Sequence, residues 1–161
     1  MSGLGELGHV ALIATLCVLL AWAAASDMQR YIIPNRICLS LLFLYPGYAL
    51  LSLSASEIGI AAALAAAVFA VGAGLFAFGI MGGGDVKLLA AVSLWAGGDH
   101  FPLFLILTTM AGGFLGLSWG PLLRYFFPAI AMAKAANGRP AIPYGVAIAV
   151  GGLFVAINLY R

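Results

Sequence analysis

The sequence predicts an all-α, polytopic membrane protein with six transmembrane helices, formed by one domain over residues 1–161. Three observations carry this prediction. Hydrophobic residues make up 65% of the chain, and charged residues only 7%, against about 25% in soluble domains. This number of charges is too small to give a globular domain of this size a polar surface. Most of the chain must therefore contact lipid. The charges also lie mainly between long apolar runs, and the basic ones are distributed unevenly.

The apolar runs locate the helices, because a spanning helix needs about 20 mostly apolar residues. The expected helices cover residues 7–25, 37–53, 58–80, 84–97, 101–119 and 142–160. The uncharged part of the fourth, residues 86–97, would reach only roughly 18 Å, whereas the hydrocarbon core is about 30 Å thick. We therefore expect this helix to begin within the glycine-rich stretch that ends at Asp85. That start places Asp85 at the membrane boundary.

The first run could also be read as a secretory signal peptide, because Ala23, Ala24 and Ala25 resemble a cleavage site. The residues before the run carry Glu6 and no Lys or Arg, which is the reverse of a signal peptide's positive start. We therefore expect the first helix to remain in the protein.

The basic residues test the six-helix arrangement, because Lys and Arg concentrate in the cytoplasmic segments of membrane proteins. With the N-terminus outside, the cytoplasmic segments hold six of the seven basic residues: Arg30, Arg36, Lys87, Arg124, Lys134 and Arg139. If the short fourth helix did not cross, the last three would move outside. The net charge of +2 therefore indicates orientation in the membrane and gives no support for nucleic acid binding.

Two acidic residues, Asp27 and Asp85, fall at helix ends on the expected cytoplasmic side, whereas the other three lie on the opposite side. An ionisable group near the hydrocarbon is costly and tends to face the bundle interior or a water-filled cavity. Two carboxylates that meet there cannot both ionise easily, so one keeps its proton while the other acts as a base. The base can take a proton from water while the protonated partner binds a peptide carbonyl. This is aspartyl protease chemistry, with Asp27 and Asp85 as the candidate catalytic residues.

The chemistry of such a pair requires no metal or cofactor, and we expect none. Cys17 and Cys38 form no CxxC pair, so neither a zinc site nor a disulfide is expected. Candidate substrate-binding residues surround Asp85 instead. Three glycines before it leave the backbone bare for a substrate strand, and a lysine follows two residues later. These four residues are Gly82, Gly83, Gly84 and Lys87.

Simpler interpretations exist for each aspartate taken singly. Asp27 could be an interfacial residue solvated by lipid headgroups, and Asp85 could cap the N-terminus of its helix. Two other classes of protein also remain open. One is a small transporter or channel subunit that uses the aspartates for protons or cations, although such sites usually lie near the bilayer midplane. The other is a non-catalytic membrane assembly factor, in which the aspartates have no chemical role.

Three stretches resemble the type IV prepilin peptidase family, whose members are membrane aspartyl proteases of the GxGD type. The first has Asp27, Arg30 and the run Ile33, Pro34, Asn35; the second runs over residues 82–89 and contains the Gly-Gly-Gly-Asp string; the third is Ile-Pro-Tyr-Gly-Val-Ala-Ile-Ala over residues 142–149. Together they extend over most of the chain. Presenilin-like proteases share the GxGD pattern but place a tyrosine before the first aspartate, where this chain has Ser26.

The resemblance implies a bacterial enzyme of the inner membrane that uses Asp27 and Asp85 on the cytoplasmic side. Its substrates would be prepilins or pseudopilins, from which it would remove a short basic leader by cutting after a glycine. Because these substrates carry a hydrophobic helix just beyond the cut, they would lie partly in the lipid bilayer. The oligomeric state is not implied.

The chain is similar to the short form of the family that is associated with Flp, or tight-adherence, pili. Longer members have an added cytoplasmic segment with paired CxxC motifs, and some of them methylate the new N-terminus. The sequence contains neither this segment nor the CxxC motifs, so we do not expect N-methylation.

Overall fold

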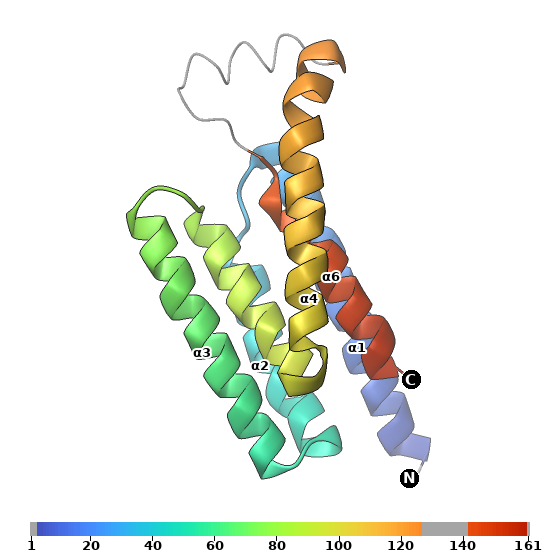
Figure 1. The fold of residues 1–161 in the computed structure, drawn as a ribbon. Helices are drawn as coiled ribbons and strands as arrows, with labels where there is room; N and C mark the ends of the chain where they lie inside the picture. Colours follow the sequence, from blue (N-terminus) through green and yellow to red (C-terminus); the bar gives the residue numbers. More distant parts are fainter. Residues whose placement is uncertain (1–2, 127–141, 161) are drawn as a thin grey trace.

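The computed structural model describes residues 3–126 and 142–160, and these residues contain helices and no strand. The helices are α1 (Gly3–Arg30), α2 (Asn35–Ser52), α3 (Ala55–Ala77), α4 (Gly83–Phe126) and α6 (Tyr144–Tyr160). The predicted all-α class is therefore confirmed. Consecutive helices run in opposite directions, so the end of α1 and the start of α4 lie at the same end of the bundle (Figure 1).

Helix α4 consists of two arms that meet at Gly97, where the backbone is not helical (φ 57°, ψ −161°). A positive φ is strained for residues with a side chain but accessible to glycine. Figure 1 shows the chain descending through the first arm and returning through the second. The two arms correspond to the helices predicted over residues 84–97 and 101–119.

The observed ends of the other helices differ from the predicted ends by a few residues. Helix α3 starts three residues before the predicted 58–80, because Ser54 and Glu57 form a capping box that includes the glutamate in the first turn. It ends early because Gly79 adopts a φ of 72° and turns the chain toward α4. Helix α1 extends to Arg30, so Asp27 lies within its last turn.

The chain has the character of an integral membrane protein. Residues Gly5–Arg30, Ala55–Ala77 and Gly83–Ser118 form helices long and apolar enough to cross a membrane, and α6 is a shorter apolar helix. Large apolar side chains also point outward, such as Phe43 and Leu50, which are 80% and 84% exposed. Lipid is the environment in which such exposure is favourable.

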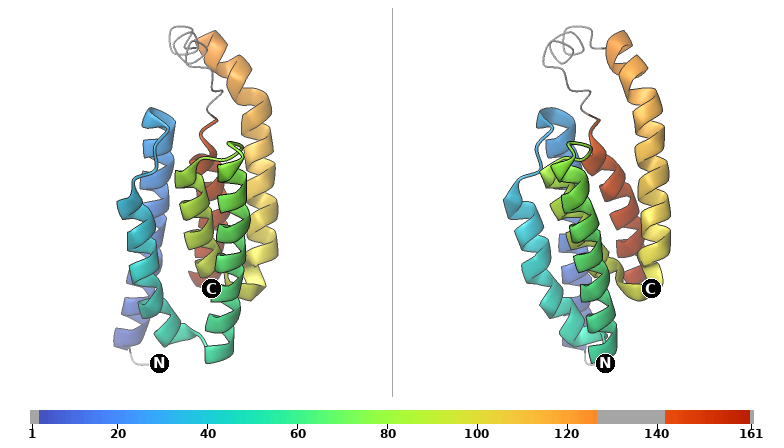
Figure 2. Two further views of the ribbon diagram at one scale, coloured as in Figure 1. Left: turned by 90° about the vertical axis from the view of Figure 1, so that its left-hand side faces the viewer. Right: turned by 60° about the vertical axis from the view of Figure 1, so that its left-hand side comes forward.

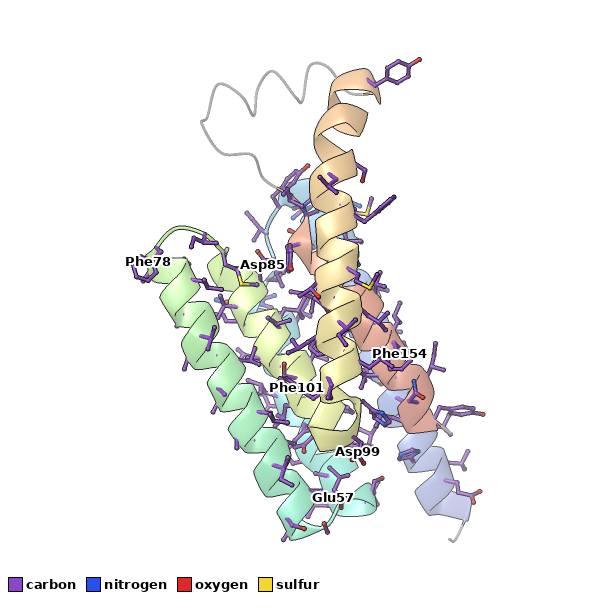
Figure 3. All side chains as sticks on the ribbon, in the orientation of Figure 1. Glu57, Phe78, Asp85, Asp99, Phe101 and Phe154 are labelled. Atoms are coloured by element: carbon purple, nitrogen blue, oxygen red, sulfur yellow. The ribbon has the colours of Figure 1, made fainter. Side chains whose placement is uncertain are left out.

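Charged residues lie near the two ends of the bundle. Arg30 ends α1, and Lys87 lies just after the first turn of α4, at the end that holds Asp85. Glu57 and Asp99 lie at the opposite end (Figure 3). Lys134 and Arg139, which are also expected on the cytoplasmic side, lie outside the described residues.

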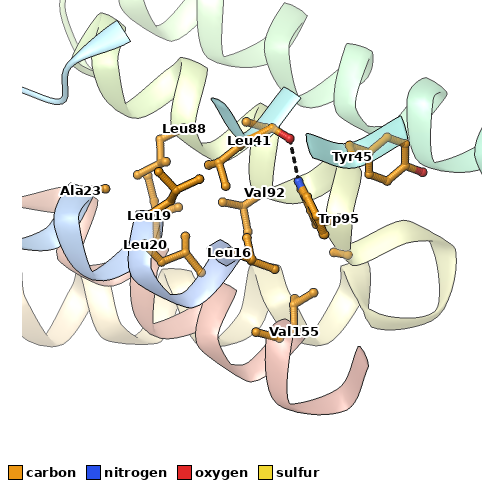
Figure 4. Packing of buried hydrophobic residues seen from close by; sticks show 14 of the residues in the cluster. Leu16, Leu19, Leu20, Ala23, Leu41, Tyr45, Leu88, Val92, Trp95 and Val155 are labelled. Atoms are coloured by element: carbon orange, nitrogen blue, oxygen red, sulfur yellow. Dashed lines mark hydrogen bonds between the residues drawn. The ribbon is translucent and has the colours of Figure 1, made fainter. Parts of the chain in front are cut away.

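The helices pack around a core in which α4 contacts α2, α3 and α6, while α1 contacts α2 and α6 (Figure 2). Near its centre, the Trp95 indole is 1% exposed and donates a hydrogen bond from Nε1 to the backbone oxygen of Leu41 at 3.0 Å (Figure 4). The rings of Tyr45 and Tyr48 lie 5.8 and 5.3 Å from it, centre to centre. Trp95 therefore joins α4 to α2 by packing and by a buried hydrogen bond.

Replacing Trp95 with phenylalanine is expected to lower the free energy of unfolding by about 1–3 kcal/mol, because the hydrogen bond and part of the packing are lost. Thermal or denaturant unfolding of the purified protein in detergent measures this change. Trp22→Phe is the matched control, since Trp22 is 54% exposed on α1. Equal destabilisation by the two substitutions would contradict the assignment of Trp95 to the core.

Candidate active site

Asp27 is buried in the last turn of α1, with 5% of its surface exposed. Its Oδ2 accepts a hydrogen bond from the backbone N–H of Gly145 at 2.7 Å. Gly145 lies in the first turn of α6, where backbone N–H groups have no partner within the helix. The carboxyl group of Asp27 therefore satisfies one of these free donors and connects the end of α1 to the start of α6. This contact excludes a simple position among lipid headgroups.

The chain turns sharply after Asp27. Tyr31 adopts a φ of 54° and donates its N–H to the Asp27 backbone oxygen at 2.9 Å. The Ser26 hydroxyl donates to the Ile32 backbone oxygen at 2.7 Å. A positive φ at a bulky residue costs energy. This turn sends Ile33 back into the bundle, where it is buried, before α2 begins after Pro34.

Asp85 lies in the first turn of α4 and is partly buried. Its carboxylate folds back on Gly82, whose backbone forms a hydrogen bond with it. This is the second half of a capping box, in which the third helical residue binds the N-cap N–H. A Cβ atom at Gly82 would lie 2.6 Å from Asp85 Oδ2, so a larger residue there would force the Asp85 carboxyl group to shift. The capping interpretation of Asp85 is therefore supported, alongside its position near Asp27.

The structure brings the surroundings of Asp27 and Asp85 together through Ile33. A Cβ atom built on Gly84, the neighbour of Asp85, would lie 3.2 Å from Ile33 Cβ. One built on Gly145, the donor to Asp27, would lie 2.9 Å from Ile33 Cδ1. The two carboxyl groups also interact electrostatically. The two aspartates thus belong to one cluster, in which Ile33 packs between two glycine backbones.

The other candidate residues lie around this cluster. A Cβ atom at Gly83 would lie 3.2 Å from the Phe76 ring of α3. The Lys87 ammonium donates a hydrogen bond to Asn35 Oδ1 at 3.0 Å, which ties α4 to the start of α2. Lys87 is exposed. Substrate binding by Gly82, Gly83, Gly84 and Lys87 stays a prediction.

Two organising residues, Ile33 and Gly145, were not singled out by the sequence reading as parts of the site. Ile33 belongs to the Ile-Pro-Asn run over residues 33–35 that carries the family resemblance, but that resemblance gave its side chain no role in the site. Gly145 lies in the stretch over residues 142–149 that carries the family resemblance, and that stretch was the available signal. The ring of Tyr144, the neighbour of Gly145, packs against Gly112 of α4.

The site offers two carboxyl groups, backbone N–H groups at two helix N-termini and one lysine. Within the described residues, no three His, Cys, Asp or Glu side chains are grouped to hold a metal ion. The arrangement can exchange protons with a water molecule and can donate hydrogen bonds to a peptide carbonyl.

A helical integral membrane protein with two acidic side chains at one end of its bundle is the class that the fold and this site define. The model of the type IV leader peptidase family matches residues 14–117. The chain belongs to this family, as the resemblance in its three motifs predicted.

Curated relatives agree with this assignment. Prepilin leader peptidase/N-methyltransferases of Burkholderia pseudomallei strains 1026b and K96243 are each 30% identical over 152 residues, which covers 85% of this chain and 43% of theirs. A protein of the same description from Stutzerimonas stutzeri is 39% identical over 72 residues, covering 45% of this chain and 21% of its own. The chain thus spans less than half the length of the curated relatives it matches. No solved structure matches it.

Proposed function

We propose that the protein is a membrane-embedded aspartic endopeptidase that removes the basic leader peptide from type IV prepilins. The main support for this proposal is that Asp27 and Asp85 belong to one cluster at one end of the bundle, in a chain of the leader peptidase family. The Flp-like prepilins that the short form implies are the proposed substrate class. Neither a capping residue nor a lipid-facing residue explains why two acidic groups share one partly buried site.

The proposed reaction begins with one carboxyl group ionised and the other protonated. The ionised carboxylate takes a proton from water, and the water oxygen bonds to the carbon of the scissile peptide. The protonated partner gives its proton to the carbonyl oxygen, which produces a gem-diol. When the C–N bond breaks, the first carboxyl group protonates the leaving nitrogen, and a diol hydroxyl returns a proton to the second. The leader leaves with a carboxyl terminus, and the pilin gains a free amine.

The membrane topology completes the proposal. Five described helices, with α4 folded into two arms, would make six crossings of a bacterial inner membrane. Arg30, Arg36 and Lys87 belong to the end that carries Asp85, and this favours a cytoplasmic position for that end. A prepilin would reach the aspartates there with its leader in the cytoplasm and its apolar helix in the bilayer.

The function is tested by incubating the purified protein in liposomes with a purified Flp-type prepilin and resolving the products by electrophoresis. Loss of the leader is the expected result. A prepilin whose glycine before the cut is replaced by a bulky residue serves as the substrate control and should stay intact. If the native prepilin also stays intact, although a known prepilin peptidase cleaves the same preparation, the proposed function is wrong.

Substituting valine for Gly84 is expected to reduce the cleavage rate strongly without changing any charge. The new Cβ would lie 3.2 Å from Ile33 Cβ and 3.6 Å from its backbone N and O, so the added methyl groups displace Ile33. The same assay measures the effect. Gly74→Val on α3 is the control, because no atom lies within 4 Å of a Cβ there. Full activity of Gly84→Val would show that close packing at Ile33 is dispensable.

A further inference from the structure

A largely apolar groove lies beside the aspartate cluster, with a cavity volume of about 470 Å³. Helices α2, α3 and the first arm of α4 line it. Its lining residues are Asn35, Cys38, Leu39, Leu42, Ala65, Phe69, Lys87, Ala90 and Ala91. Leu39, Leu42 and Phe69 are each 45–49% exposed, so the groove faces the surroundings of the bundle. In a membrane, those surroundings are lipid.

The polar end of the groove lies close along the chain to the residues of the aspartate cluster. Lys87 lies two residues after Asp85, and Asn35 begins the helix that follows the Asp27 turn. Cys38, one turn further along α2, is buried. From Asn35 to Leu42 the groove follows about two turns of α2, or roughly 10 Å. It therefore runs from Lys87 and Asn35, at the end of the bundle that holds Asp85, along α2 toward the middle of the bundle.

The polarity of the groove changes along its length. Its two polar side chains, Lys87 and Asn35, are hydrogen-bonded to each other at the end near Asp85. The side chains further along are apolar, apart from the thiol of Cys38. A peptide that is cut must be extended at the cut, and its carbonyl groups then need donors, which the Lys87 ammonium offers. A helix that starts beyond the cut has free N–H groups in its first turn, and Asn35 Oδ1 can accept from them. The remaining apolar surface matches a hydrophobic helix.

We propose that this groove binds the first turns of the substrate's hydrophobic segment, immediately after the cleavage point. The groove then holds the scissile bond at the level of the aspartates. Lys87 and Asn35 bind the backbone where the substrate changes from extended to helical. This inference rests on the proposed function, because it gives the occupant as the prepilin on which that function acts.

Filling the groove tests the proposal. Ala65→Phe places a ring among the lining residues of α3, and Ala66→Phe places the same ring on the adjacent, exposed position outside the lining. Ala65→Phe is expected to lower kcat/KM for prepilin cleavage by about tenfold or more, as for other changes of fit in an apolar pocket. Ala66→Phe should stay near the native value.

The outcomes separate the two proposals. If the native protein does not cleave prepilin, the proposed function fails. If the native protein cleaves and both phenylalanine variants cleave equally well, the groove does not bind the substrate, and an acyl chain of a lipid becomes its better occupant.

A crosslinking measurement keeps the test independent of any folding defect in Ala65→Phe. Leu39→Cys and Val150→Cys are introduced separately into a chain with Cys17→Ala, Cys38→Ala and the inactivating Asp85→Asn. The native residues are 49% and 48% exposed, but Leu39 lines the groove and Val150 lies on α6, outside it. A prepilin with one cysteine in the first two turns of its apolar segment should form a disulfide with Leu39→Cys only. Equal crosslinking at both positions, or at Val150→Cys alone, would overturn the proposal.

Discussion

Asp27→Asn and Asp85→Asn are each expected to lower the rate of leader cleavage by at least about 10²–10⁴-fold, the contribution of a positioned acid or base. Asparagine has the shape of aspartate but cannot take a proton from water. In Asp27→Asn, the amide oxygen of the new side chain could still accept from the Gly145 N–H, so the connection between α1 and α6 should survive. The loss should therefore appear in a protein that remains folded and inserted in the membrane.

The cleavage assay in liposomes measures this effect, and Asp99→Asn is the matched control. Asp99 is exposed at the opposite end of the bundle, so its substitution removes an acidic group without affecting the pair. Processing at a near-native rate by either Asp27→Asn or Asp85→Asn would exclude the two-aspartate mechanism. Normal pilus assembly with both variants would favour the interpretation of the protein as an assembly factor.

The common location of Asp27 and Asp85 at one end could be predicted from the sequence, because location depends on counting crossings. Two helices separate the aspartates, and an even number of crossings returns the chain to the side where it started. The uncharged runs were enough for that count. The helix ends were less predictable, since an absence of charge was the criterion and Glu57 belongs to a helix as part of its capping box.

The lateral arrangement of the helices could not be predicted in the same way. The helices are apolar on most of their faces, so no stripe of hydrophobic residues shows which side meets which neighbour. The contact between Gly145 and Asp27 joins residues 118 positions apart, one at the start of α6 and the other at the end of α1. Ile33 reaches its place because Tyr31 adopts a positive φ, a conformation that its residue type disfavours. The backbone preference of tyrosine therefore did not predict the turn that places Ile33 in the site.

Gly145→Ala is expected to reduce cleavage about as much as a misplaced catalytic group does, which is about 10²-fold for an error of 1 Å. The added Cβ would lie 2.9 Å from Asp27 Oδ2 and 3.1 Å from Asp27 Cβ. Both distances are too short, and neither Asp27 nor the backbone of α6 is a flexible end that can move away cheaply. The carboxyl group must shift, and the hydrogen bond from the residue 145 N–H lengthens or breaks.

Kinetics distinguish this displacement from a general loss of packing. If the alanine moves Asp27 while the prepilin still binds, kcat should fall and KM should change little. Gly113→Ala is the control on α4, where no atom lies within 4 Å of a Cβ, and it should cleave normally. An unchanged kcat in Gly145→Ala would mean that catalysis does not depend on the exact place of the Asp27 carboxyl group. A general base requires a narrow geometry, so this result would contradict that role for Asp27.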